Sequence, residues 1–326
     1  MNTTRQFDLL RKPRPDPRMY HQLTAADAGW EFLNFCAVRL KPGEEYDHST
    51  CDHECVLVVL GGICTVSSSR GTWKNIGRRP DVFSGMPYGL YLPRNTDVRV
   101  SVEATGVDFA LGWCPADKDF PARLVTPDQI TVELRGGGNA SRQINSIVPP
   151  SSPGQRMIAV EVYTPPGNWS SYPPHKHDHH RVDGGGVLLE ADLEEVYFYK
   201  IDRPDGFAIQ RIYTDDRTLD RTIVAANDDL VLIPRGYHPV AAAPGYAVYY
   251  LNFLAGSAKS LASTDDPAYA WVKQAWPPLD PRVPLVRTDR SRGGRRGWCH
   301  VQPRHREHGG PPGTRAVGGA PRRDHS

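Results

Sequence analysis

The sequence contains no apolar run that approaches the roughly 20 residues of a membrane span, so no membrane protein is predicted. Residues 1–20 carry several arginines and prolines but no continuous apolar segment, and we therefore expect no secretory signal. Cysteine is scarce: the six thiols form no paired framework for a chain of this size, which is typical of reduced thiols in a cytoplasmic protein. Cys51 and Cys55 have no second pair nearby, so we interpret them as buried or incidental thiols.

Nucleotide-binding and DNA-reading motifs are also missing. The glycine-rich stretch 135–142 lies between two arginines, but no Lys-Ser/Thr pair follows it as in a phosphate-binding loop. We therefore interpret residues 117–142 as a structural connector. No pair of helices suited to a helix-turn-helix is predicted, which argues against a sugar-sensing regulator.

The composition favours a strand-rich globular protein. The chain has 326 residues, of which 39% are hydrophobic and 23% charged, and it contains 30 glycines and 30 prolines. Between residues 30 and 116, short apolar runs alternate with Gly- and Pro-containing turns, a spacing typical of an antiparallel barrel or sandwich. The order of strands and turns is similar in the second half, which indicates two related barrels.

The second half carries a candidate metal site. His175 and His177 are two residues apart, so they point the same way from an extended strand. Glu195 shares a face with Tyr197 and Tyr199 by the same rule, and His238 follows an apolar run and a Pro-x-Gly turn. Three imidazoles and one carboxylate make an open site for a divalent metal.

Three neighbouring residues compete for places in this ligand set. His179 and His180 follow directly, on the Gly-rich loop between His177 and Glu195, a candidate lid. Glu194 is the rival of Glu195, but strand phase favours Glu195 and would point Glu194 toward solvent or the loop. The first half offers His48, His53 and Glu54 without a His-x-His motif, so we expect its barrel to be degenerate and structural.

The ordered His-x-His, Glu and Pro-x-Gly-x-His pattern resembles the cupin superfamily. The stretches 170–178, 210–217 and 234–240 resemble, more narrowly, the 5-deoxy-glucuronate isomerase family of inositol catabolism, and the likeness extends from about residue 30 to 285. It implies an all-β fold of two cupin (double-stranded β-helix) barrels in tandem. The expected divisions are an N-terminal extension 1–29, a degenerate barrel 30–116, a connector 117–142, a metal-binding barrel 143–286 and a disordered tail 287–326.

The resemblance implies an aldose-ketose isomerase that converts 5-deoxy-D-glucuronate to 5-dehydro-2-deoxy-D-gluconate through an enediol. The implied cofactor is a divalent metal, Zn²⁺ first and Mn²⁺ or Fe²⁺ as alternatives, at His175, His177, Glu195 and His238. The proton could be moved by a water on the metal or by one of four tyrosines, namely Tyr197, Tyr199, Tyr213 and Tyr237.

Two arginines are candidates for the carboxylate of a sugar-acid substrate. Arg211 shares a strand face with Tyr213, and its planar guanidinium can hold a carboxylate with two bonds if that face lines the barrel. Arg235 lies just before His238. The alternative for Arg211 is a solvent-exposed side chain or a pair with Asp215 or Asp216.

Two other functions use the same ligand set. A cupin dioxygenase would hold Fe²⁺ there and consume oxygen, and a non-catalytic cupin would only bind a sugar acid. We expect a small-molecule substrate, no nucleic-acid or membrane partner, and, on general grounds, a homo-oligomer.

The last 40 residues differ from the rest of the chain. From Arg287 onward there are ten arginines against three acidic residues, whereas the whole chain has a net charge of +2. The tail lacks apolar periodicity, so we expect disorder. A non-native extension, such as a frameshift product, is favoured over a nucleic-acid-binding arm, because no aromatic residues are interleaved with the arginines.

Overall fold

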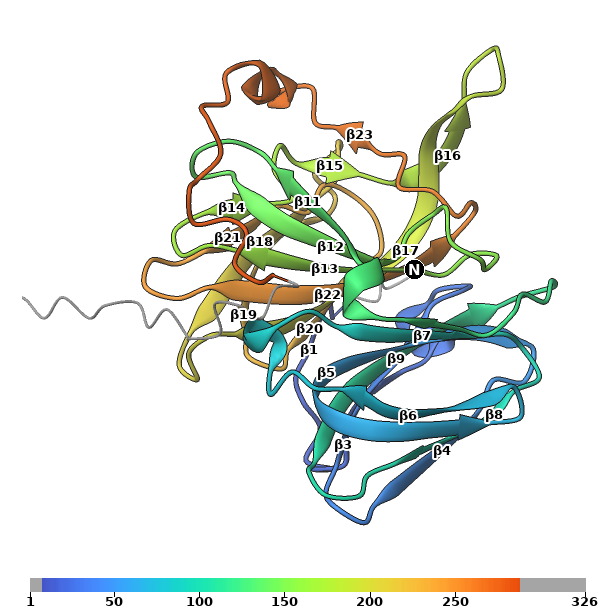
Figure 1. Ribbon diagram of the computed structural model, residues 1–326. Helices are drawn as coiled ribbons and strands as arrows, with labels where there is room; N and C mark the ends of the chain where they lie inside the picture. The colour runs from blue at the N-terminus through green and yellow to red at the C-terminus, as the bar shows by residue number, and fades with distance from the viewer. Residues whose placement is uncertain (1–7, 288–326) are drawn as a thin grey trace, which may run out of the picture. The chain divides into compact units, whose positions relative to one another are not determined.

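A computed structural model describes residues 8–287, and they form almost only β-structure (Figure 1). All pairings between named strands are antiparallel, as the short apolar runs predict. The predicted disorder of the basic tail 287–326 concerns residues that, from 288 on, lie outside the described ones. The short helical elements are α1 (Ala25–Ala28), η1 (Val82–Ser84), η2 (Pro127–Gln129) and η3 (Ala270–Gln274).

The first barrel is built around the long strand β5, which pairs with β6, β7, β8 and β9. Its strands are β2 (Met19–Leu23), β3 (Asn34–Leu40), β4 (Glu45–Ser49), β5 (His53–Ser68), β6 (Gly71–Gly77), β7 (Tyr88–Leu92), β8 (Asp97–Ser101), β9 (Val107–Pro115) and β10 (Arg123–Val125).

The second barrel is built around β17, which pairs with β16, β20 and β22. Its strands are β1 (Leu10–Arg11), β11 (Thr131–Arg135), β12 (Arg142–Val148), β13 (Ile158–Thr164), β14 (Trp169–Ser170), β15 (His175–Lys176), β16 (Asp178–Val182), β17 (Leu188–Ile201), β18 (Phe207–Tyr213), β19 (Asp220–Ala226), β20 (Leu230–Ile233), β21 (Val240–Ala242), β22 (Val248–Gly256) and β23 (Thr264–Asp265).

Strand alternation divides the apolar side chains into three layers. On β17, Tyr197 and Tyr199 point into the core of the second barrel, whereas Val196 and Phe198 point into a layer shared by both barrels. On β5, the residues on one face fill the first barrel and those on the other join the shared layer. Full burial of one large apolar side chain such as Phe198 contributes about 1.5–3 kcal/mol, so the shared layer holds the two barrels together.

The central strands occupy equivalent places in the two barrels. Cys55 on β5 lies opposite residues of both β7 and β9, and Glu195 on β17 lies opposite residues of both β20 and β22. The same three-strand unit therefore occurs twice, once with a thiol and once with a carboxylate at its centre.

The segments expected as a mere extension and connector contribute strands to both barrels. Strand β1 pairs with β20 and β2 pairs with β3, although both precede residue 30. Strands β10 and β11, from the connector, pair with β7 and β12. These edge strands are short and pair through backbone hydrogen bonds. Their sequences therefore show too little apolar periodicity for the strands to be predicted.

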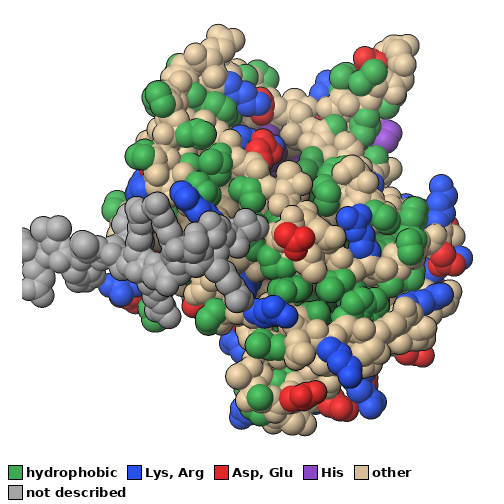
Figure 2. All heavy atoms as spheres, viewed as in Figure 1, with side chains coloured by type: hydrophobic (Ala, Val, Ile, Leu, Met, Phe, Trp, Pro, Cys, Tyr) green, Lys and Arg blue, Asp and Glu red, His purple; other side chains and the backbone are tan. Residues whose placement is uncertain are grey.

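In residues 8–287 no helix is both long and apolar enough to cross a membrane. Figure 2 shows side chains of both charge signs interspersed on the face drawn. On the same face the surface is hollowed between the projecting β16–β17 hairpin and the segment that follows β23.

Candidate metal centre

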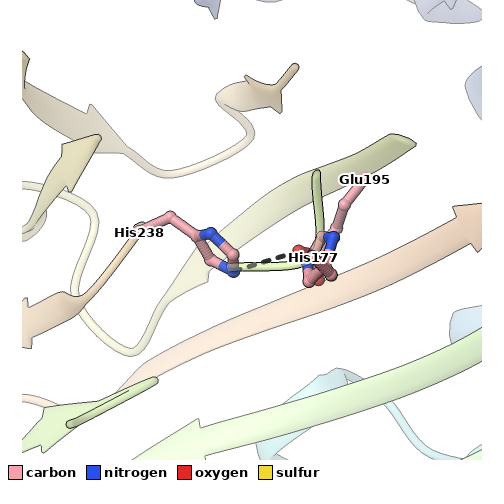
Figure 3. Close-up of side chains that lie close together, drawn as sticks. All are labelled: His177, Glu195 and His238. Atoms are coloured by element: carbon pink, nitrogen blue, oxygen red, sulfur yellow. Dashed lines mark hydrogen bonds and ion pairs between the residues drawn. The ribbon is translucent and has the colours of Figure 1, made fainter. Parts of the chain in front are cut away.

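Three buried side chains from three segments of the second barrel meet at one point (Figure 3). His177 lies between β15 and β16, Glu195 on β17, and His238 between β20 and β21. One potential ligand atom of each lies within 4.8 Å of the others. Glu195 Oε2 is 2.9 Å from Nε2 of His177 and 3.3 Å from Nε2 of His238. Within residues 8–287 this is the group of His, Cys, Asp and Glu side chains arranged to hold a metal.

Backbone carbonyls orient both imidazoles toward the carboxylate. Nδ1 of His177 donates to the Leu193 carbonyl at 3.1 Å, and Nδ1 of His238 donates to the Gly236 carbonyl at 2.8 Å. With the proton on Nδ1, a neutral imidazole presents its Nε2 lone pair to the common point. A hydrogen bond of this kind fixes the ring of a metal-binding histidine.

The electrostatics differ between the two rings. Burial lowers the pKa of His238 to about 4, against the attraction of Glu195, so this ring is neutral near pH 7. Burial also disfavours a charged His177, but the hydrogen bond and charge of Glu195 outweigh it and raise its pKa. Nε2 of His238 is buried and forms no hydrogen bond with any described residue.

These properties fit a divalent cation. A buried imidazole nitrogen without a hydrogen bond is costly unless something binds it, and a metal ion needs such a lone pair. A cation between the three groups would also replace the proton that now joins His177 to Glu195. Nitrogen and carboxylate ligands together suit zinc, iron or manganese.

His175, the fourth expected ligand, stands next to this group. Its ring centroid lies 4.8 Å from that of His238 and 6.3 Å from that of His177. Burial, followed by the charges of His238 and His177, places its pKa well below the usual value, so the ring is neutral. His175 is therefore available as a fourth nitrogen ligand, although its ring atoms lie outside the tight group of three.

The competing histidines lie elsewhere. His179 is exposed on β16, 3.6 Å from Asp178 Oδ1, and Nδ1 of His180 lies 2.8 Å from the Ser257 hydroxyl. Neither side chain belongs to the group formed with Glu195.

Glu194 has a structural role that the sequence did not predict. Its carboxylate accepts three backbone N–H bonds, from Glu31 at 2.6 Å, Phe32 at 2.9 Å and Leu33 at 2.7 Å. The expectation that this side chain points to solvent or the loop is therefore wrong. Strand phase did separate the two glutamates correctly, since Glu195 joins the histidines while Glu194 binds the chain that enters strand β3 of the first barrel.

One of the four candidate tyrosines lies next to a candidate metal ligand, and a second packs behind it. The Tyr197 ring is 5.8 Å from that of His238, and its hydroxyl is 3.0 Å from Ser171 Oγ. Tyr199 lies one step further along β17 and donates to Gln210 Oε1 at 2.9 Å.

Sequence reasoning missed two partners of Tyr197. The Tyr250 ring lies 4.6 Å from that of Tyr197, and both hydroxyls meet Ser171 Oγ. Ser171 has a left-handed backbone, with φ near 50°, an uncommon conformation for serine that aims its hydroxyl at this pair.

The other two tyrosines form a separate cluster. Tyr213 and Tyr237 pack with tilted rings whose centroids are 5.1 Å apart, and their hydroxyls donate to Asp266 and Asp215 at 2.7 and 2.8 Å. Because these hydroxyls are committed to carboxylates, neither one is presented to the metal ligands.

The two arginines chosen from the sequence do not line the barrel. Arg211 binds Asp220 with two hydrogen bonds of 2.9 and 2.7 Å, and its side chain is 42% exposed. The inner face of β18 is instead marked by Gln210, which accepts from Tyr199. Arg235 is exposed in the turn before His238. The face of β18 that carries Arg211 is therefore the outer one, as in the solvent-exposed alternative, although the partner is Asp220. The alternation of side chains along a strand shows which residues share a face but not which face is inside.

The candidate ligands of the first barrel do not converge. Glu54 accepts backbone N–H bonds from Gln155, Arg156 and Met157, while His53 lies 2.6 Å from Asp52. His48 packs edge-on against Trp113. Among the described residues these side chains form no group like that of Glu195.

Comparisons with known proteins agree with this architecture. Residues 9–272 match the model of the KduI/IolB family. A relative from Geobacillus thermodenitrificans, named 5-deoxy-glucuronate isomerase, is 43% identical over 78% of this chain and 91% of its own. The crystal structure of an IolB-like protein from Salmonella typhimurium LT2 is 36% identical, with a TM-score of 0.77 over 81% of this chain and 99% of that one.

A more distant structure supports the fold alone. A mutant of Bacillus subtilis oxalate decarboxylase shares 12% identity with a TM-score of 0.55 over 79% of each chain. The fold is thus the tandem cupin arrangement expected from the sequence, and the chain belongs to the KduI/IolB family.

Proposed function

We propose that this chain is a 5-deoxy-glucuronate isomerase, which converts the open-chain aldehyde 5-deoxy-D-glucuronate to the ketose acid 5-dehydro-2-deoxy-D-gluconate in myo-inositol catabolism. The observation that carries the proposal is the buried group of His177, Glu195 and His238. It occurs in a chain that covers 91% of a relative bearing that name.

We propose His175, His177, Glu195 and His238 as the ligands of a divalent ion, with zinc as the first candidate. Such an ion, when bound, supplies Lewis acidity toward a carbonyl oxygen and a neighbouring hydroxyl. The carboxylate of Glu195 provides the negative charge that offsets the cation, and the carbonyl-bound imidazoles keep the other ligands in place.

The reaction moves hydrogen between two adjacent carbons without net oxidation. A proton leaves C2 and another is added at C1. The C2 hydroxyl loses its proton and the C1 carbonyl oxygen gains one, so the carbonyl moves from C1 to C2. Burial, followed by the charge of Glu195, raises the pKa of Tyr197 well above its usual value, so its hydroxyl stays protonated. In this proposal Tyr197, supported by Ser171, holds a hydrogen-bond donor toward a substrate oxygen and does not act as the base.

The proposal is tested with the purified protein and a matched pair of histidine variants. The wild type is expected to contain about one divalent ion per chain and to convert 5-deoxy-D-glucuronate. His238→Ala removes a buried ligand and should lose both the metal and at least about 99% of the activity. His180→Ala removes an exposed imidazole bound to Ser257, and both properties should be retained.

Elemental analysis and a coupled assay for the ketose product give the two readouts. A wild type that is loaded with metal but leaves 5-deoxy-D-glucuronate unchanged would refute the activity. Full metal occupancy in His238→Ala would refute the ligand set. Oxygen uptake during turnover would point to an Fe²⁺ dioxygenase instead.

A further inference from the structure

Arg142, the first residue of β12, is a buried guanidinium without an acidic partner among the described residues. The residue is only 4% exposed. Its Nη1 donates to the carbonyls of Ala140 and Tyr172 at 3.3 and 3.0 Å. Nε and Nη2 form no hydrogen bond with residues 8–287.

Another arginine of this chain shows how such burial is normally compensated. Arg79 is also 4% exposed, but it binds both oxygens of Glu161 at 3.0 and 3.3 Å. Buried charges are usually paired in this way, because removal of an ion from water is costly without an opposite charge. Arg142 has the burial of Arg79 without its carboxylate.

The Arg142 side chain lies on the face of β12 that belongs to the second barrel. The next residue, Gln143, points the other way and binds the backbone of Val286, whereas Ile144 packs on the second barrel's core. Strand alternation therefore puts Arg142 on the barrel side with Ile144.

Arg142 is also close to the proposed metal ligands. The carbonyl of Tyr172 that it binds lies three residues before His175. Burial lowers the pKa of His175 and the charge of Arg142 adds to that effect, whereas at Tyr250 the same charge opposes the burial that raises the pKa. Burial lowers the pKa of Arg142 itself to about 10, so it remains charged near pH 7.

We infer that Arg142 forms a carboxylate-binding subsite beside the metal centre, which holds the acid group of the substrate. This inference rests on the proposed function. The unbonded Nε and Nη2 are one edge of the planar guanidinium, and that edge can donate two parallel hydrogen bonds to a carboxylate. The substrate would then supply the negative charge that the protein does not, and a neutral aldose would leave the charge unpaired.

The inference predicts a defect in substrate binding that depends on the substrate's acid group. In Arg142→Gln, KM for 5-deoxy-D-glucuronate should rise about 10–100-fold with a smaller change in kcat, because a charged hydrogen-bonded pair is lost. Added guanidinium should partly restore the rate. Arg211→Gln, at the arginine that binds Asp220, is the matched control and should change KM less than about twofold.

Arg142→Lys serves if the Gln variant does not fold, because it keeps a buried charge but cannot form the two-bond fork. It should show raised KM and no rescue by guanidinium. Thermal unfolding and metal content show that each variant remains intact. A KM within twofold of the wild type in a folded Arg142 variant would overturn the inference while leaving the proposed function standing.

If the wild type does not turn over 5-deoxy-D-glucuronate, calorimetry separates the two ideas. Metal-loaded wild type should bind 5-deoxy-D-glucuronate at least about 10-fold more tightly than 5-deoxy-D-glucose, which has a CH₂OH group in place of the carboxylate. Arg142→Gln should lose that preference. Equal affinities in the wild type would overturn the inference whatever the reaction is.

Discussion

Replacement of Glu194 is expected to destabilise the protein without weakening binding of the proposed metal ion. The carboxylate accepts three backbone N–H bonds from residues 31–33, all between 2.6 and 2.9 Å. Hydrogen bonds to a charged group contribute about 1.5–3 kcal/mol each, so three amount to about 4.5 kcal/mol even at the low end. Water can reach this half-buried site and satisfy part of the lost bonding. We therefore expect Glu194→Ala to lower the free energy of unfolding by about 2–4 kcal/mol.

A graded series makes this prediction sharper. Glu194→Gln keeps one acceptor oxygen and should cost about half as much, roughly 1–2 kcal/mol. Glu103→Gln changes an exposed glutamate and should stay within about 0.5 kcal/mol. Scanning calorimetry should show the midpoint of Glu194→Ala about 4–8 °C below that of the wild type, with Gln in between.

The metal content separates this role from that of its neighbour. Because Glu194 points away from the histidines, both variants should bind metal as the wild type does. If Glu194→Ala unfolds within 1 °C of the wild type, the three backbone bonds do not stabilise the protein. If it loses metal with unchanged stability, the assignment of Glu194 and Glu195 to opposite faces is wrong.

Two further predictions concern the other glutamate and the end of the described chain. Glu195→Gln removes the anionic ligand, so metal affinity should fall about 10–100-fold or more in a direct titration, with little change in the unfolding midpoint; retained affinity would argue against this site. A chain that ends at Arg287 keeps Val286, which is buried and forms two hydrogen bonds with Gln143, and should fold and turn over normally. A chain that ends at Leu285 loses these contacts and should melt several degrees lower; equal midpoints for the two truncations would show that Val286 contributes nothing.

The alternation of side chains along a β-strand was sufficient to group the residues of β17 by face. It predicted a common face for Glu195, Tyr197 and Tyr199, and all three point into the second barrel, where Glu195 meets the histidines. The apolar residues Val196 and Phe198 occupy one face of β17, so the polar residues lie on the other face. The prediction worked because the strand carried strong signals on both faces.

The same rule failed on β18, where both faces carry mixed residues. Arg211 and Tyr213 do share a face, but it is the outer one, and the inner face belongs to Gln210 and Ile212. Only the pairing of Gln210 with Tyr199 from another strand decides this, and such a long-range contact is not visible in local sequence.

The sequence did not predict Arg142 as a site residue, for a related reason. The glycine-rich run before it indicated a linker, although residues 131–135 and 142–148 form the β11–β12 hairpin. The feature that marks Arg142 is a buried positive charge with no carboxylate bound to it among the described residues. A sequence shows which charges are present, but the pairing of each charge depends on the fold.

On the central strands β5 and β17, one face has the same structural role in both barrels, whereas the other face differs between them. Glu54 and Glu194 hold equivalent positions on β5 and β17, and each binds three backbone N–H groups that precede a strand of the opposite barrel. The next residue on each strand points the other way: it is Cys55 in the first barrel and Glu195 in the second. Residues on opposite faces of a strand contact different layers, so one can change without disturbing the other. The first barrel can therefore lack the metal ligands and still hold the second barrel in place.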